Sequence, residues 1–493
     1  MKLFIVLLTG AFMLATGTSD VFAKKKEKVQ TEAKSDQVQT VSKKRNTQYP
    51  RLFKNKRVVT KKGLITIHKI NDKLYFEFPK SLLGRDFLMG SSVSATSNNT
   101  SGLVGQTMTT PLHIRFAIQE DHIYMQNVTP VSRMDVYSNQ SDISRAVAKS
   151  NITPNMESFK IAAYNMDSTA VVFEVTKFFF ADNKRLPLFD QNSASLEDEK
   201  YGKLELKAIL KKNLSSIRNF YVFDDNLEIN LDMSFYQSLL ANKREVRGGN
   251  VRVKAVYSML LLPEEVMTWR LGDPRLGYTY TKKQKISTEK DGTAFSYLQH
   301  KWNLLPTDKE AYRRGDLVAP RKPVLFYIDS DFPEAWKKAI KEGVNWWNEA
   351  FKMAGFKDAV QTADFPANDT TFYAGNLKYS CIRYAPVNLS KTQSKVWVDP
   401  RSGEIINGTI FVGHDIAKTI ASQRFVQTAQ VDERMRGIQL SEEALLEGIR
   451  LYVAREVGHC LGLADNASAS AAFSVESLRS PEFTRQNGIA SSV

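Results

Sequence analysis

The chain is poor in cysteine and histidine, and no stretch after its N-terminus stays apolar for long enough to cross a membrane. Its 493 residues include two cysteines, Cys381 and Cys460, and six histidines. A chain of this length can bury a core without disulfides, and nothing in the sequence brings the two cysteines together, so their pairing is left open. The later apolar runs fall short of the about 18 residues that a transmembrane helix needs. A small disulfide scaffold and a membrane-spanning helical protein are therefore excluded.

The first 23 residues are typical of a secretory signal peptide. Lys2 precedes an apolar run from Leu3 to Ala15, and a polar stretch then ends in Val21-Phe22-Ala23. This pattern predicts removal after Ala23. Because no cysteine follows to carry a lipid, we expect an exported protein without a lipid anchor, either periplasmic or extracellular.

The net charge of +15 is concentrated in one segment. Residues 24–62 contain 14 Lys or Arg against 3 Asp or Glu, a net of +11, which leaves +4 for the rest. We interpret residues 24–57 as a solvated basic leader, with contact to anionic lipid or polysaccharide as the alternative. A charge confined to a leader does not indicate a nucleic-acid-binding fold.

Residues 58–305 are expected to be rich in β-structure, in two subdomains with a boundary near residues 95–105. Alternating residues in 58–70 and 73–78 predict a hairpin about an Asn71-Asp72 turn. The polar stretch 91–105 is predicted to be a loop. Further strands are predicted at 113–118, 123–128, 170–180, 219–223, 227–235 and 252–262.

The remaining chain, residues 323–493, alternates strands and helices after a charged, proline-punctuated linker at 306–322. Strands are predicted at 323–329, 380–384 and twice within 395–412, around a turn at 399–403. Helices are predicted at 333–355 and at 441–459, the latter with Ser441 as its N-cap and two glutamates in its first turn. The whole chain is thus predicted to be an α+β multidomain protein.

The last helix carries the most informative motif. Residues 454–466 read AREVGHCLGLADN. In the zinc-protease pattern HExxHxxGxxH, two histidines one helical turn apart and a third after a glycine turn hold zinc, while the glutamate activates water. The three ligand positions are here Arg455, His459 and Asp465, and the glutamate is Glu456. Helical spacing predicts that Glu456 and His459 face a packed domain or its cleft.

Several longer strings resemble a known family: secreted bacterial zinc-dependent metalloproteases, in which two N-terminal domains of unknown function precede a metzincin-type catalytic domain. They are KGLITIH (62–68), SLLGRD (81–86), YSCIRYAP (379–386), WVDPRSGEI (397–405) and RFVQTAQVD (424–432). The resemblance implies a mixed sheet with a long active-site helix in residues 323–493. It also implies a domain that is truncated, since relatives continue beyond Val493 into a methionine turn.

The same resemblance implies hydrolysis of peptide bonds by metal-activated water, with Zn²⁺ as the cofactor, Glu456 as the catalytic base, and His459 and Asp465 as metal ligands. Arg455 departs from the family pattern, because a protonated guanidinium has no lone pair to give to zinc. Three alternatives stay open. Arg455 turns to the surface, or its guanidinium takes the zinc position and pairs with Asp465 or Glu456, or a weaker metal site survives with Glu456 as a ligand.

Three interpretations of the function also stay open, and the third does not depend on the motif. In the first, the chain is a non-catalytic metzincin-like protein, a pseudoenzyme, which binds an extended peptide or protein segment along the strand Gly408–Gly413. In the second, it is an active or weakly active zinc endopeptidase. In the third, the N-terminal β-region binds a glycan or protein at the cell surface. The remaining histidines, including His414 at the start of a predicted helix, are expected to have ordinary core or surface roles.

Overall fold

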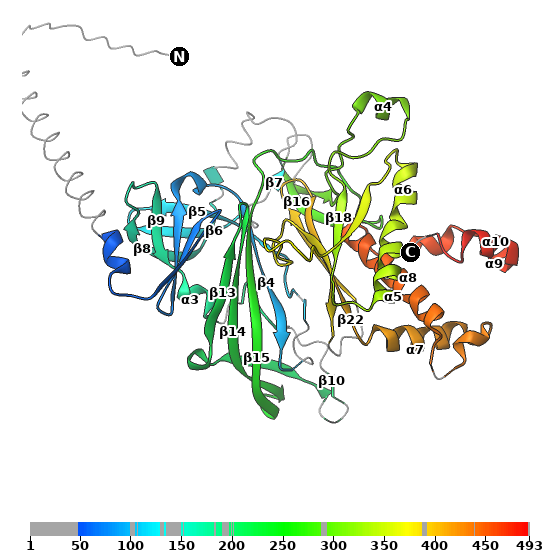
Figure 1. Cartoon of the computed structure of the whole chain (residues 1–493), viewed down its shortest axis with the longest axis horizontal. Coiled ribbons are helices and arrows are strands. Elements are labelled where there is room, and N and C mark those ends of the chain that lie inside the picture. The colour runs from blue at the N-terminus through cyan, green and yellow to red at the C-terminus, as the bar shows by residue number, and fades with distance from the viewer. Residues whose placement is uncertain are drawn as a thin grey trace, which may run out of the picture.

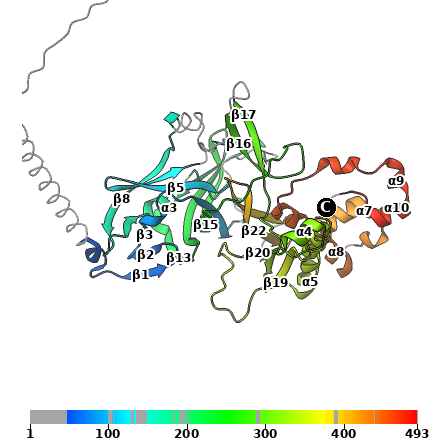
Figure 2. The same ribbon diagram turned by 90° about the horizontal axis from the view of Figure 1, so that it is seen from above.

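The computed structural model describes residues 48–98, 104–105, 107–128, 133–134, 149–150, 152–181, 184–189, 197–198, 200, 202–286, 293–386, 392–437 and 439–491. The predicted signal peptide and most of the predicted basic leader lie outside the described residues. The views in Figures 1 and 2 agree on one arrangement: a β-rich part at one end, a smaller sheet beside it, and helices at the other end. The predicted α+β class is confirmed.

One antiparallel sheet of 12 strands forms most of the β-rich part, in the order β1-β2-β3-β9-β8-β6-β5-β4-β15-β14-β12, with β13 also paired to β14. Its phenylalanines form the centre of a core; the ring centroids of Phe78 and Phe116 lie 4.8 Å apart. The strands are β1 (Val58–Lys62), β2 (Thr66–Ile70), β3 (Lys73–Pro79), β4 (Phe87–Thr96), β5 (Leu112–Gln119), β6 (His122–Asn127), β8 (Asn155–Tyr164), β9 (Ala170–Glu174), β12 (Glu205–Leu210), β13 (Ser216–Val222), β14 (Asn226–Ala241) and β15 (Arg244–Leu261).

Two smaller sheets accompany it. β17 (Thr293–Gln299), β16 (Tyr280–Ile286) and β7 (Arg133–Met134) form a three-stranded sheet. β10 (Glu197–Asp198) pairs with β11 (Gly202–Lys203). The strands at 113–118, 123–128, 219–223, 227–235 and 252–262 were predicted from their alternation, and each overlaps a strand of the structure.

Four predictions in this part were wrong in detail. The segment 58–70 is itself a hairpin of β1 and β2, so β3 is a third strand. The predicted loop at 91–105 begins as strand, because β4 runs to Thr96 and pairs with β15. The predicted strand 170–180 ends at Glu174, and Thr176–Phe179 form the short helix α3, which buries two adjacent phenylalanines. Residues 48–53, expected in the leader, are helical and pack against the sheet.

The C-terminal part contains a five-stranded mixed sheet in the order β19-β18-β20-β22-β21. Its strands are β18 (Val324–Ile328), β19 (Val360–Asp364), β20 (Ser380–Ala385), β21 (Gln393–Asp399) and β22 (Glu404–Gly413). The first four in spatial order are parallel, and β21 is antiparallel to β22. The predicted addition of a peptide strand along Gly408–Gly413 was wrong, because β22 already has a strand on each side. Among the described residues the edge next to it is β21.

Helices cover one face of this sheet, as Figure 1 shows for α5 and α8. The helices of this part are α4 (Lys309–Arg314), α5 (Glu334–Asn345), α6 (Trp347–Met353), α7 (Ile416–Thr428), α8 (Glu442–Cys460), α9 (Val475–Arg479) and α10 (Pro481–Asn487). The helix predicted at 333–355 corresponds to α5 and α6 in succession. The predicted linker 306–322 contains α4 and packs on the C-terminal part, since Val318 is buried against Phe356.

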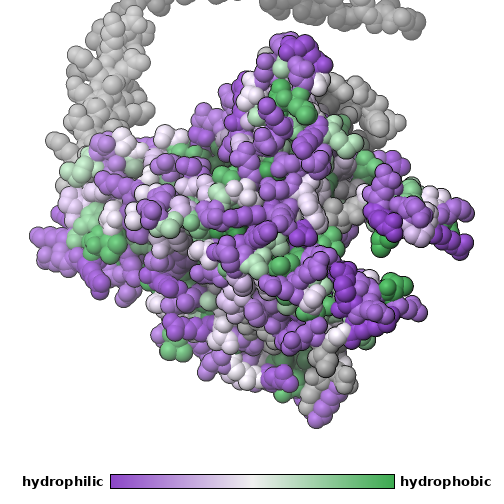
Figure 3. All heavy atoms as spheres, turned by 45° about the vertical axis from the view of Figure 1, so that its right-hand side comes forward, coloured by the Kyte–Doolittle hydropathy of each residue, from purple (hydrophilic) through white to green (hydrophobic). Residues whose placement is uncertain are grey.

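The surface is mainly hydrophilic. On the face drawn in Figure 3, the hydrophobic side chains of the described residues occur in small groups separated by hydrophilic ones. Within the described ranges, no helix is long and apolar enough to cross a membrane.

Candidate functional site

The motif lies at the C-terminal end of α8. The Ser441 hydroxyl accepts a hydrogen bond from the Ala444 N–H, so this residue is the N-cap that the sequence predicts. One side of the helix packs against α5 and β22 and buries Val453 and Val457. Glu456 is 4% exposed, and the predicted inward direction of this side chain is confirmed.

A glycine turn then brings the chain back toward the helix. Gly462 has φ of +97°, and a Cβ at this position would lie 2.4 Å from the carbonyl oxygen of His300. Only glycine meets both conditions without strain. The segment after the turn is held by the β-rich part, since Thr279 N–H donates to Gly462 and Ala464 N–H donates to Gly277. Asp465 follows directly.

The turn places Asp465 beside Arg455. The guanidinium Nη2 of Arg455 lies 2.7 Å from Asp465 Oδ1, and its Nη1 lies 3.3 Å from Glu456 Oε1. His459 Nε2 is 3.9 Å from the same Asp465 oxygen, and its Nδ1 is 3.0 Å from the carbonyl oxygen of Leu463. All four motif residues named from the sequence are therefore together. The guanidinium lies between two carboxylates, as in the alternative in which Arg455 takes the zinc position and pairs with Asp465 or Glu456.

The motif residues offer fewer lone-pair donors than a catalytic zinc ion needs. Catalytic zinc has three protein ligands and a water, each ligand giving a lone pair. Within the part of the chain that the structure describes, no three His, Cys, Asp or Glu side chains are grouped to hold a metal ion. The Asp465 oxygen that faces His459 already accepts from Arg455. The motif residues therefore do not fit a catalytic zinc ion.

The two ion pairs of Arg455 differ in how far their carboxylates are exposed to water. The side chains of Arg455 and Asp465 are 43% and 78% exposed, so their ion pair is well screened. Glu456 has a side chain that is only 6% exposed, and its contact with Arg455 occurs where water is scarce. The guanidinium therefore matters more to Glu456 than to Asp465.

The two cysteines are free and buried. Cys381 lies on β20 and Cys460 at the end of α8, with a thiol close to Gly408 of β22. Burial raises the pKa of both thiols, that of Cys381 to about 12. His414 precedes α7 and forms a 2.6 Å hydrogen bond with Tyr384 of β20. It therefore contacts the sheet and not the motif residues.

A second candidate site was missed by sequence analysis. It is a cavity of about 480 Å³ between the large sheet and the face of the C-terminal sheet that α5 and α8 do not cover. Its charged residues are Arg218 on β13, Glu228 on β14, Arg383 on β20 and Lys395 on β21. They come from distant strands, so no spacing in the sequence connects them. The one local signal is a glutamate within the apolar stretch that forms β14.

Three family models match parts of the chain. Residues 437–493 match a family described as Met-zincin, residues 105–307 match a domain of unknown function (DUF5117), and residues 47–96 match another (DUF5118). No curated protein and no solved structure matches. The C-terminal domain is therefore metzincin-like, and the matching family is related to metallopeptidases that use zinc.

Proposed function

We propose that this chain is an exported, non-catalytic relative of zinc metallopeptidases, in which Arg455 replaces a ligand histidine and a guanidinium–carboxylate cluster stands where a metal centre would be. Its C-terminal domain then binds peptide or protein segments without hydrolysing them. The observation that carries the proposal is the guanidinium of Arg455 between Asp465 and Glu456.

A charge argument supports the loss of metal. A guanidinium about 4 Å from a divalent ion repels it by about 8 kcal/mol at an effective dielectric constant of about 20. That is comparable to the about 10 to 16 kcal/mol with which a complete structural site holds zinc. His459 and Asp465 alone offer two ligands and cannot offset the repulsion. Using Glu456 as a third ligand would remove the base that the hydrolysis needs.

In this proposal the peptide adds to β21 and not to β22. Among the described residues β21 pairs with β22 alone, so its other edge has backbone groups without a strand partner. An extended peptide can add to such an edge through main-chain hydrogen bonds. The helix that carries the motif, α8, also packs against β21.

Zinc stoichiometry and a proteolysis assay test the proposed loss of metal and of hydrolysis. We expect the purified wild-type chain to hold much less than one zinc and to show no chelator-sensitive cleavage of casein. Arg455→His should raise zinc content, and Arg455→His with His459→Ala should return it to the wild-type level. One zinc per wild-type chain, together with cleavage that EDTA stops and zinc restores, would overturn the proposal in favour of an active endopeptidase.

A pair of peptides tests the proposed strand addition to β21. An extended apolar peptide and the same peptide N-methylated at alternate residues have nearly the same side chains, but the second lacks the N–H groups that strand addition uses. We expect the first to bind in fluorescence anisotropy and the second to bind at least about tenfold more weakly, since several hydrogen bonds are lost. Equal binding of the two peptides would reject strand addition.

A further inference from the structure

The cavity between the two sheets is independent of the motif on α8. Residues alternate across the C-terminal sheet: Ile382 and Ile410 face the helices, whereas Arg383, Thr409 and Phe411 line the cavity. The opposite wall is formed by β4, β14 and β15, and includes Ser92 and Ser94. A volume of about 480 Å³ is in the range of small-molecule sites.

One wall holds a fixed carboxyl group. Glu228 is 4% exposed, and its Oε1 accepts hydrogen bonds from the Tyr373 hydroxyl at 2.5 Å and from the Asn230 amide at 2.7 Å. Burial raises the pKa of Glu228, although these hydrogen bonds and the nearby cations oppose the shift. The ring of Tyr373 is stacked on Tyr221 with centroids 4.2 Å apart, which keeps its hydroxyl in place.

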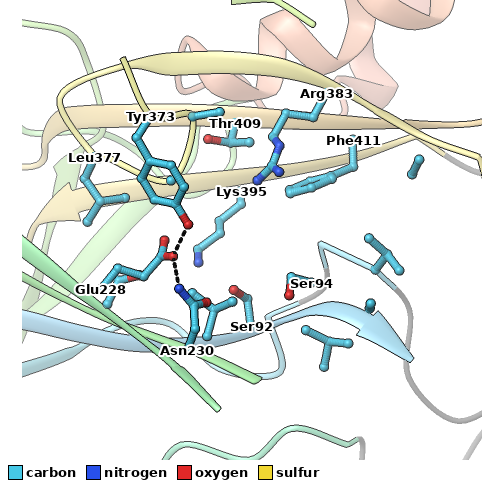
Figure 4. A pocket seen from close by; sticks show the side chains of 18 of the residues that line it. Ser92, Ser94, Glu228, Asn230, Tyr373, Leu377, Arg383, Lys395, Thr409 and Phe411 are labelled. Atoms are coloured by element: carbon cyan, nitrogen blue, oxygen red, sulfur yellow. Dashed lines mark hydrogen bonds between the residues drawn. The ribbon is translucent and has the colours of Figure 1, made fainter. Parts of the chain in front are cut away.

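Two cations extend into the same space from the C-terminal sheet. Figure 4 shows Arg383 and Lys395 directed toward the wall that carries Ser92 and Glu228. Each lies near an aromatic ring: Lys395 Nζ is 5.0 Å from the centroid of Trp397, and the Arg383 guanidinium carbon is 5.4 Å from that of Phe411. Within the described ranges, no hydrogen bond or ion pair joins either cation to another side chain.

Such an arrangement is costly without a ligand. Burial lowers the pKa of Lys395 to about 8; Glu228 opposes this shift and the like charge of Arg383 adds to it. Glu228 is the one carboxylate in the cavity lining, against three cations, and no ion pair joins it to Arg383 or Lys395 within the described residues. An excess of cations facing a cavity is a usual feature of a site for an anion, which would supply the missing charge-assisted hydrogen bonds.

We propose that this cavity binds a small hydroxylated molecule bearing one oxyanion group, a carboxylate or a phosphate, with Arg383 and Lys395 holding the anion. The polar remainder of the ligand faces the hydroxyl groups of Ser92, Ser94 and Thr409, and Glu228 accepts a hydrogen bond from one of its hydroxyls. The sheet-to-sheet position makes the ligand a contact between the β-rich part and the C-terminal part.

Three related probes test the charge requirement by calorimetry on the full chain: gluconate, glucose 6-phosphate and glucose. We expect saturable binding of at least one anionic probe, weakened by added salt, and much weaker binding of glucose. The anionic probe that binds more tightly identifies carboxylate or phosphate as the ligand group. No saturable binding of either anionic probe, or equal binding of glucose, would overturn the proposal.

Variants then assign the residues. Arg383→Gln and Lys395→Met should each weaken the anionic probe by about tenfold or more, the cost of a lost hydrogen bond to a charged group. Lys338→Met, the same change at an exposed position of α5, should leave binding unchanged. Because burial disfavours the charged form of Lys395 more than the nearby Glu228 favours it, Lys395→Met should unfold at no lower temperature than wild type. Variants that bind the probe as tightly as wild type would give both cations a structural role and reject the site.

Discussion

Arg455 and Asp465 are ten residues apart, yet their side chains form a 2.7 Å hydrogen bond. The contact exists because α8 ends at Cys460 and the chain reverses at Gly462. The β-rich part holds the reversed segment through hydrogen bonds at Gly277 and Thr279. The geometry of the motif therefore depends on residues nearly 200 positions earlier in the chain.

The first prediction concerns this turn. Gly462→Ala should destabilise the protein by about 3 kcal/mol or more, because a positive φ costs a side chain about 1 to 2 kcal/mol and the new methyl group also meets the His300 carbonyl. Gly84→Ala is the control, since Gly84 has φ of +76° and open space around it. Urea unfolding of both variants separates the cost of the positive φ from the cost of the contact with His300. Equal losses in the free energy of unfolding would mean that the contact with the His300 carbonyl is unimportant.

The second prediction concerns the buried carboxylate of the motif. Arg455→Met should cost about 1 to 3 kcal/mol, because Glu456 loses its charged partner in a nearly dry position. In a Glu456→Gln background the same change should cost under about 1 kcal/mol, since only the exposed pair with Asp465 is then lost. The coupling is measured by urea unfolding of all four proteins. Identical costs in both backgrounds would show that Arg455 does not stabilise Glu456.

The third prediction concerns the cysteines. Both thiols are buried and free, and burial raises their pKa values, so little thiolate is present at pH 8. We expect a thiol reagent to titrate both groups only after unfolding, under non-reducing conditions. Rapid reaction of the folded protein, or fewer than two thiols in denaturant, would contradict the free and buried state of Cys381 and Cys460.

The C-terminal domain was predictable because its signals are local. A serine followed by two glutamates starts α8, and a glycine-containing turn ends it; both patterns act within a few residues. The β-rich part was harder to predict where packing overrides alternation. β4 continues through small polar residues because it pairs with β15, and the consecutive residues Phe178 and Phe179 of α3 are both buried.

The candidate sites also differ in how far the sequence could predict them. Motif spacing located Arg455, Glu456, His459 and Asp465, whereas the contact between the guanidinium and both carboxylates depends on a tertiary turn. The cavity between the sheets could not be predicted, because strand register and the packing of the two sheets determine that Lys395 and Glu228 line the same space. The same limit explains the error on β22: the sequence identifies a strand, but the order of strands in a sheet is a long-range property.

The fourth prediction concerns Asp86, which connects the two parts of the protein. Its carboxylate accepts hydrogen bonds from His113 at 2.8 Å and Arg115 at 2.5 Å, and it lies 3.4 Å from Arg401 in the turn between β21 and β22. Burial alone would raise the pKa of Asp86, but the hydrogen bonds from His113 and Arg115 outweigh it and hold the pKa far below its usual value.

A lowered carboxyl pKa stabilises the fold above the unfolded-state pKa, which is about 4, and the contribution is lost as the pH falls toward the folded-state value. Asp86→Asn should therefore cost about 2 to 3 kcal/mol at pH 7, and the difference from wild type should shrink below about pH 4. Asp121→Asn, which breaks an exposed pair with His122, should cost less than about 1 kcal/mol. Urea unfolding between pH 7 and pH 3 measures both variants. A difference for Asp86→Asn that stays constant with pH would show that the ionised carboxylate is not what holds this contact.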